Sequence, residues 1–146
     1  MLPTMRSGQP WRDPDTIRWI LDECETWAVV GLGDNPFRDA HRVAHFLQRQ
    51  GKRIVPVHPD AATVHGEKGY AELGDIPFEV DCVDVFRRAD AAGEFADRAV
   101  DLGAKAVWFQ LGVVDQAAYA RTTTAGLDMV MDCCPVIEWP MYGPPA

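Results

Sequence analysis

Apolar residues in this chain follow two alternating patterns. Short, nearly uninterrupted apolar runs are typical of strands buried on both faces, and between them lie segments whose apolar residues recur at helical spacing. The runs predict strands at about Trp27–Leu32, Arg53–Val57, Val80–Phe86, Ala106–Gln110 and Leu127–Met131. The amphipathic segments predict helices from Asp13 to about Cys24 and at Asp39–Gln50, Ala89–Leu102 and Asp115–Thr124.

Three further segments carry weaker patterns. A short edge strand is expected near Lys68–Tyr70, and Met1–Asp13 is expected to form a loose arm. The tail from Pro135 to Ala146 is rich in proline, so we expect it to pack outside the sheet rather than within it.

Strands that alternate with helices of this length indicate an α/β fold with right-handed crossovers. We expect a doubly wound, mostly parallel sheet of five or six strands with helices on both faces. In such sheets ligands bind beyond the carboxyl ends of the strands, where the strand order reverses. This rule selects four loops: Gly31–Arg38, His58–Asp60, Phe86–Ala89 and Gln110–Val113.

Composition narrows the choice of partner. The chain has 146 residues, 47% of them apolar, and a formal net charge of −8, as expected of one globular domain with an acidic surface. That charge disfavours nucleic-acid and anionic-membrane partners, so an anionic ligand would need locally placed arginines. No apolar run reaches the ~20 residues of a membrane span, and the cysteines show no C-x-x-C spacing. We therefore expect a cytoplasmic protein.

A glycine turn ends the first predicted strand, at Gly31-Leu32-Gly33. Glycines at such a turn let backbone N–H groups approach a pyrophosphate at the start of the next helix, although many such turns need glycine for conformation alone.

The sequence departs from the NAD-binding fingerprint at two positions. Pro36 stands where the third glycine belongs, and the second strand ends in His58 and Pro59, with Asp60 one step beyond the usual acidic position.

Candidate ligand contacts follow the other strands. Arg87 and Arg88 stand at a helix start, where the helix dipole disfavours cations unless an anion lies between. Arg38 and Arg42 share one face of the first crossover helix and can reach the glycine turn, or they can simply face water. The remaining candidates are the strand-end residues Phe86, Gln110, Leu111 and Gly112 and the thiol of Cys134, which follows the last predicted strand. A thiol that stands at a helix start can have a lowered pKa.

No catalytic or metal-binding set is visible. His41 and His45 are spaced to share a metal ion, but no third ligand lies nearby in the sequence. His58 and His65 are loop residues with no evident partner. Asp84 and Asp132 lie near strand ends and also have no evident partner. We therefore predict no metal and no catalytic residue.

Five motifs in order carry a family resemblance: Val29-Val30-Gly31-Leu32-Gly33, Val55-Pro56-Val57-His58-Pro59, Val83-Asp84-Val85-Phe86-Arg87-Arg88, Trp108-Phe109-Gln110-Leu111-Gly112-Val113 and Val130-Met131-Asp132-Cys133-Cys134. Together they resemble the small stand-alone coenzyme A (CoA) binding proteins of bacteria and archaea, whose domain also occurs in the succinyl-CoA synthetase alpha subunit. The resemblance implies a Rossmann-like domain over residues 26–137, preceded by an arm and helix (1–25) and followed by a proline-rich tail (138–146).

The resemblance also implies an arrangement of CoA. The pyrophosphate would lie on Gly31–Gly33 and the adenosine end toward His58 and Pro59. Arg38, Arg42 or Arg87 would meet phosphates. The pantetheine arm would pass Phe86 and Gln110–Val113.

The chain departs from the family pattern in two places. Asp60 replaces a lysine, which removes a cation from the adenosine end, and Cys133 replaces an arginine beside the family cysteine, Cys134. A mixed disulfide between CoA and one of these cysteines is therefore a hypothesis to test.

The sequence thus predicts non-catalytic binding of CoA or an acyl-CoA. The alternatives are an NAD(P)-binding oxidoreductase-type domain, and a degenerate CoA-ligase-like domain that serves as an interaction scaffold. Trp139, Met141 and Tyr142 in the tail could cover an interface with a second copy or a partner enzyme.

Overall fold

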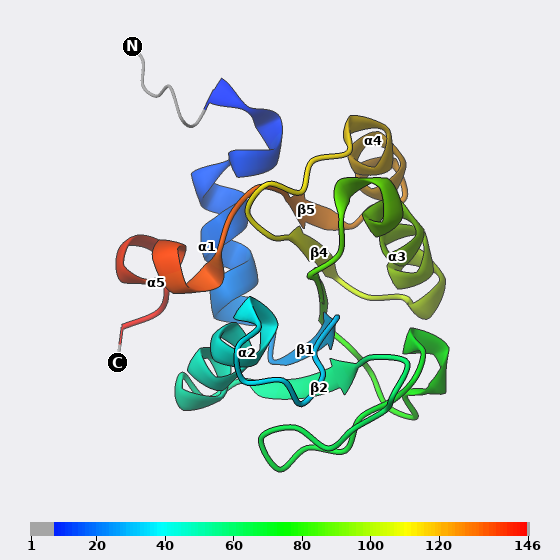
Figure 1. The fold of residues 1–146 in the computed structure, drawn as a ribbon. Coiled ribbons are helices and arrows are strands. Elements are labelled where there is room, and N and C mark those ends of the chain that lie inside the picture. The colour runs from blue at the N-terminus through cyan, green and yellow to red at the C-terminus, as the bar shows by residue number, and fades with distance from the viewer. Residues whose placement is uncertain (1–7, 146) are drawn as a thin grey trace.

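A computed structural model describes residues 8–145 as a three-layer α/β domain (Figure 1). The central sheet has five strands, all parallel, in the order β2-β1-β3-β4-β5. The strands are β1 (Thr26–Val30), β2 (Arg53–Val57), β3 (Cys82–Val85), β4 (Ala106–Phe109) and β5 (Asp128–Val130). The order reverses between β1 and β3, which pair directly. The predicted doubly wound fold is confirmed, with β1 and β3 at the switch point.

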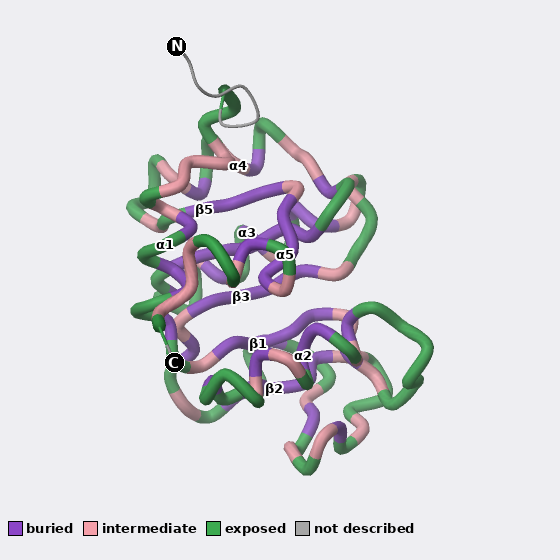
Figure 2. The backbone as a smooth tube through the Cα atoms, turned by 90° about the vertical axis from the view of Figure 1, so that its left-hand side faces the viewer, coloured by how far each residue is buried: buried purple, intermediate pink, exposed green. Residues whose placement is uncertain are grey.

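Helices cover both faces of this sheet (Figure 1). On one face lie α1 (Pro14–Glu23), α2 (Asp39–Arg49) and α5 (Pro135–Tyr142), and on the other lie α3 (Ala89–Leu102) and α4 (Gln116–Thr124). The first face packs around large side chains such as Trp27 and Trp108, whose rings lie 5.8 Å apart. The second packs closely, because α3 presents buried alanines at helical spacing. The strands are buried along nearly their whole length (Figure 2).

Local sequence explains most of the helix boundaries. Asp13 caps α1 by accepting a hydrogen bond from the Thr16 N–H at 2.9 Å, and Pro14 occupies the first helical position. Gly103 ends α3 in the left-handed conformation that glycine adopts without strain. The four helices predicted from periodicity are therefore confirmed to within a few residues. No helix among residues 8–145 is long and apolar enough to span a membrane.

Two expectations need correction. The expected edge strand near Lys68–Tyr70 is only an isolated bridge, in which Tyr70 pairs with Val57. Residues 8–13 of the expected loose arm are docked, since the Met131 N–H donates to the Trp11 carbonyl and Trp11 packs edge-on against Tyr119. Residues 1–7 of that arm lie outside the described residues.

The proline-rich tail contains a helix that the sequence pattern did not predict. Pro135 occupies the first position of α5, where no N–H donor is needed, and Pro140 lies inside the helix. The helix lies outside the sheet, as expected, and packs against α1 and α2. Its partly buried Trp139 meets Phe46 of α2 edge-on, with ring centroids 5.8 Å apart. Tertiary packing has thus overridden the low helix propensity of proline.

Candidate functional site

A pocket of about 990 Å³ opens at the carboxyl ends of the strands, beside the switch point. All four of the loops selected from the sequence contribute to its lining. Of the fourteen site residues predicted from the sequence, eleven line the pocket: Gly31, Gly33, Arg38, Arg42, His58, Pro59, Phe86, Arg87, Gln110, Leu111 and Cys134. The structure therefore brings most of the predicted residues into one cavity.

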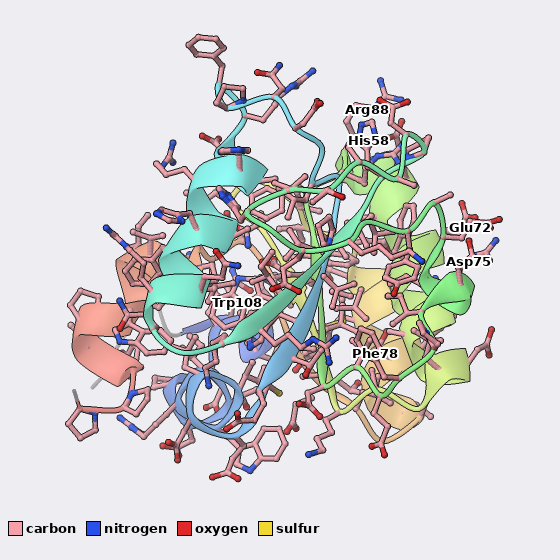
Figure 3. All side chains as sticks on the ribbon, turned by 90° about the horizontal axis from the view of Figure 1, so that it is seen from below. His58, Glu72, Asp75, Phe78, Arg88 and Trp108 are labelled. Atoms are coloured by element: carbon pink, nitrogen blue, oxygen red, sulfur yellow. The ribbon has the colours of Figure 1, made fainter. Side chains whose placement is uncertain are left out.

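Three predicted residues lie elsewhere. Leu32 is fully buried in the core, and Arg88 is on the surface (Figure 3), where its side chain is 86% exposed and pairs with Asp90 at 3.4 Å. Gly112 donates its N–H to Asp132 at 2.7 Å. Asp132 and Asp84, which had no evident partner in the sequence, are both hydrogen-bonded in the structure.

The glycine turn is tightly built against the neighbouring loops. Gly31 has a φ of 99°, and a Cβ there would lie 2.7 Å from the Phe86 carbonyl oxygen, so no other residue fits without a shift. Gly33 faces the ring of His58, which would lie 3.3 Å from an added Cβ. The His58 ring is held in turn by the Asp60 N–H, which donates to Nδ1 at 3.2 Å. The β1 and β2 loops therefore form one wall of the pocket.

The charges in the pocket are mixed rather than simply basic. Arg42 pairs with Asp39 at 3.1 Å, and Arg98 of α3 lies 3.2 Å from Glu94 and 3.8 Å from Glu72. In contrast, Arg38 and Arg87 make no ion pair with any residue between 8 and 145, and Arg87 lies 5.5 Å from the ring centre of Phe95. These two arginines follow β1 and β3, on either side of the switch point, and are available to an anion.

Helices α2 and α3 both begin without side-chain caps. The residues before α2 and α3 are Arg38 and Arg88, and neither makes a side-chain cap hydrogen bond. The first N–H groups of a helix need partners, and together they favour an anion. Asp39 and Ala40, in the first turn of α2, line the pocket, so this helix start is available to a bound phosphate.

A polar pair lies where β3 and β4 end. The Asp84 side chain is fully buried, and Gln110 is 6% exposed and lines the pocket. Gln110 Nε2 donates to Asp84 Oδ1 at 2.5 Å, while Asp84 Oδ2 is buried and has no hydrogen-bond partner among the described residues. Burial raises the pKa of Asp84 to about 7, although the Gln110 amide acts in the opposite direction.

The two adjacent cysteines differ in position. Cys134, just before α5, lines the pocket, whereas Cys133 is almost fully buried in the core. A helix start can lower the pKa of a thiol, but burial raises the pKa of Cys134 despite hydrogen bonds from the backbone of Val136 and Ile137. The thiol at the pocket is therefore held in its protonated form.

The histidines are better partnered than the sequence indicated. The ring of His65 stacks with those of His41 and His45, at centroid distances of 4.2 and 4.9 Å, and its Nε2 lies 2.7 Å from the His41 carbonyl oxygen. Burial and the two neighbouring imidazoles lower the pKa of His41. No group of His, Cys, Asp and Glu side chains within residues 8–145 is arranged to hold a metal ion.

Other lining residues were not predicted, among them Asp34, Asn35, Phe37, Glu72, Phe95 and Arg98. Phe37 is 93% exposed at the end of the glycine loop. Phe95 and Arg98 lie on a helix rather than in a loop, and helical periodicity alone does not distinguish residues at a pocket from residues facing solvent. The signal in the sequence that could have drawn attention to Phe37 was its place directly after Pro36, inside the selected loop Gly31–Arg38.

Comparison with known proteins identifies the family. Residues 25–140 match the family model of a CoA binding domain. The chain belongs to the CoA-binding domain family. It is also 35% identical over 118 residues to the uncharacterized protein YneT of Bacillus subtilis (strain 168), a match that covers 81% of this chain and 87% of YneT. The resemblance stated from the five motifs is confirmed.

Solved structures share the fold of this CoA-binding domain over most of its length. A hypothetical protein from Pyrococcus horikoshii OT3 superposes with a TM-score of 0.87 at 32% identity, covering 97% of this chain and 99% of that one. The cell-free ID.343 protein from Thermus thermophilus gives a TM-score of 0.79 at 32% identity, covering 88% and 97%.

A larger structure shares the fold alone. The dinucleotide-forming acetyl-coenzyme A synthetase 1 of Ca. Korarchaeum cryptofilum gives a TM-score of 0.66 at 19% identity. The similarity covers 76% of this chain but only 26% of that one. The family domain is thus present here at close to the full length of its small relatives.

Proposed function

We propose that this chain binds CoA or an acyl-CoA, without chemistry of its own, in the pocket at the carboxyl ends of the strands. The observation that carries the proposal is the grouping of three chemically distinct features in one cavity: the glycine turn, unpaired arginines and a nearly buried amide. CoA needs all three, since it carries a pyrophosphate, a 3′-phosphate and a neutral pantetheine arm. A volume of about 990 Å³ also suits an extended ligand.

The phosphates are assigned to the side of the pocket nearest the glycine turn. There the backbone of Gly31 and Gly33 can approach closely, the start of α2 offers N–H groups, and Arg38 and Arg87 offer unpaired guanidinium groups. The adenosine end is assigned to the His58–Pro59 wall. The pantetheine arm is assigned to the apolar Phe86 and Leu111 and to Gln110, with its thiol end toward Cys134.

Binding alone, rather than catalysis, fits the side chains in the pocket. Its cysteine has a raised pKa, and several of its lining carboxylates are engaged with arginines or with His58. We therefore infer a cytoplasmic module that holds CoA for use elsewhere, alone or beside a second copy or a partner enzyme. An NAD(P) site is the competing proposal, because Asp60 lies in the loop that follows β2 and lines the pocket.

Calorimetry with CoA, dephospho-CoA and NAD on the reduced protein tests this proposal. We expect micromolar CoA binding that is weaker for dephospho-CoA, because the 3′-phosphate adds a charge-assisted contact, and no NAD binding. Preferential NAD binding would favour the oxidoreductase-type alternative. An absence of binding for all three ligands would favour the interaction scaffold.

A further inference from the structure

The Gln110 amide has a fixed orientation because of the carboxyl group behind it. In the parallel pairing of β3 with β4, Asp84 lies opposite Trp108. Gln110 follows Trp108 by two residues, so its side chain points to the same face of the sheet as that of Asp84. There its Nε2 donates to Asp84 Oδ1 at 2.5 Å. Asp84 Oδ1 is an acceptor when the carboxyl is ionised and also when the carboxyl carries its proton on the unpartnered Oδ2, so it selects the NH₂ end of the amide. The two ends of the Gln110 amide are therefore not interchangeable.

The other end of this amide remains available. Gln110 Oε1 makes no hydrogen bond with any residue between 8 and 145, and it is not among the buried atoms that lack a partner. Since Gln110 lines the pocket, its unpaired oxygen is the atom that a ligand can reach. A carbonyl oxygen in this position accepts hydrogen bonds and repels other acceptors.

We propose that Gln110 is a specificity-determining residue whose Oε1 accepts a hydrogen bond from an amide N–H of the pantetheine arm, and that Asp84 is the residue that positions it. The inference rests on the proposed function and deepens it. The arm of CoA carries two amide N–H donors, whereas its phosphates and a thioester carbonyl are acceptors that Gln110 Oε1 would reject. The selective contact is thus made to the arm, and CoA and acyl-CoA share it.

Two CoA analogues test the contact on the unaltered protein. In each, one of the two pantetheine amide N–H groups is replaced by an ester oxygen, which keeps the length of the arm but converts a donor into an acceptor. We expect one analogue to bind about 10-fold or more weakly than CoA in calorimetry, because Gln110 Oε1, once covered by the arm, loses its partner and faces a second acceptor. The other analogue should bind much as CoA does.

Variants then assign the effect to this pair of residues. Gln110→Met, similar in size but lacking the acceptor, should bind CoA about 10-fold more weakly and discriminate little between CoA and either analogue. Asp84→Asn retains an acceptor for Gln110 Nε2 and should retain the discrimination. Asp84→Leu removes that acceptor, frees the amide to rotate, and should reduce the discrimination.

The outcomes distinguish a failure of this inference from a failure of the proposed CoA binding. If the wild-type protein binds CoA and both analogues equally, or if Gln110→Met still discriminates, the inference is wrong while CoA binding stands. If the wild-type protein does not bind CoA, the proposed function fails and the inference fails with it. If Asp84→Asn and Asp84→Leu discriminate equally between CoA and the sensitive analogue, the positioning role of Asp84 is wrong, while the contact made by Gln110 stands.

Discussion

The two ends of strand β3 hold aspartates only three residues apart, in opposite electrostatic environments. At the amino end, Asp81 Oδ2 accepts the backbone N–H groups of Glu25 and Thr26, each at 2.9 Å, and Oδ1 lies 3.4 Å from Lys105 Nζ. Burial alone would raise the pKa of Asp81, but these hydrogen bonds and this cation more than offset it, and the pKa is lowered. The charge at this end is satisfied from within the protein.

At the carboxyl end, Asp84 has one donor and one buried oxygen without a partner among the described residues. Its pKa is raised rather than lowered. A buried polar atom without a protein partner costs free energy, so Asp84 is the less stabilising of the two aspartates. The difference separates a structural role at the amino end of this strand from the ligand-binding role that we propose for its carboxyl end.

The largest expected effect is on the pH dependence of stability in Asp84→Asn. A carboxyl whose pKa rises from 3.8 unfolded to about 7 folded makes folding less favourable as the pH rises through that interval. The slope is about 1.4 kcal/mol per pH unit. The variant lacks this titration, so its stability relative to wild type should increase by roughly 3 kcal/mol between pH 5 and pH 8. Urea unfolding at both pH values measures the change.

The direction of this effect is the diagnostic result. At pH 5 the wild-type Asp84 is protonated in the folded state, and the asparagine of the variant offers no advantage, since its NH₂ group occupies the position of an unpartnered oxygen. At pH 8 the wild type buries a charge and the variant does not. Stability curves that remain parallel from pH 5 to pH 8 would contradict the raised pKa and remove the contrast between the two ends of β3.

A second prediction compares two adjacent arginines beyond the carboxyl end of β3. Arg87→Ala should weaken CoA binding by about 1–3 kcal/mol, since it removes an unpaired guanidinium from the pocket. Arg88→Ala is the matched control, because it removes the same charge one residue later from a side chain that points to solvent. It should change the dissociation constant less than twofold. Calorimetry of both variants with CoA measures the difference, and equal losses would mean that overall charge, not a specific contact, determines affinity.

These two arginines also mark the limit of what could be predicted from the sequence. The periods of the apolar pattern predict the strands and most helices, because local spacing determines them. The switch point follows from the doubly wound strand order that this alternation of elements indicates. The same patterns place Arg87 and Arg88 at a helix start, but they do not determine which of the two turns toward the pocket. That choice depends on packing against Phe95 of α3.

Contacts between residues that are distant in the sequence could not be predicted from the sequence either. Asp84 and Gln110 are separated by 26 residues, and neither residue alone indicates a pair. His65 meets His41 and His45 only because the loop after β2 folds back over α2. Helix α5 forms because its tertiary contacts outweigh the proline penalty, which sequence propensity does not include.

The smallest expected effect is at the amino end of β3, where Asp81→Asn should destabilise the protein by about 1–2 kcal/mol at pH 7. The variant replaces charge-assisted hydrogen bonds with neutral ones and loses the attraction of Lys105, which is half-exposed and contributes little. Because the folded pKa of Asp81 lies below 3.8, the advantage of the wild type is present above that pH and lost as the pH falls through the folded pKa.

Urea unfolding at pH 7 and in acid measures this difference, with Asp101→Asn as the control at an exposed carboxylate that should change stability by less than about 0.5 kcal/mol. Asp81→Asn should also leave the affinity for CoA unchanged, because its hydrogen bonds lie at the opposite end of the strand from the pocket. A loss of CoA affinity in this variant, without loss of stability, would break the division of roles along β3. Stability lost at pH 7, with the affinity retained, would place the structural charge and the ligand site at opposite ends of one strand.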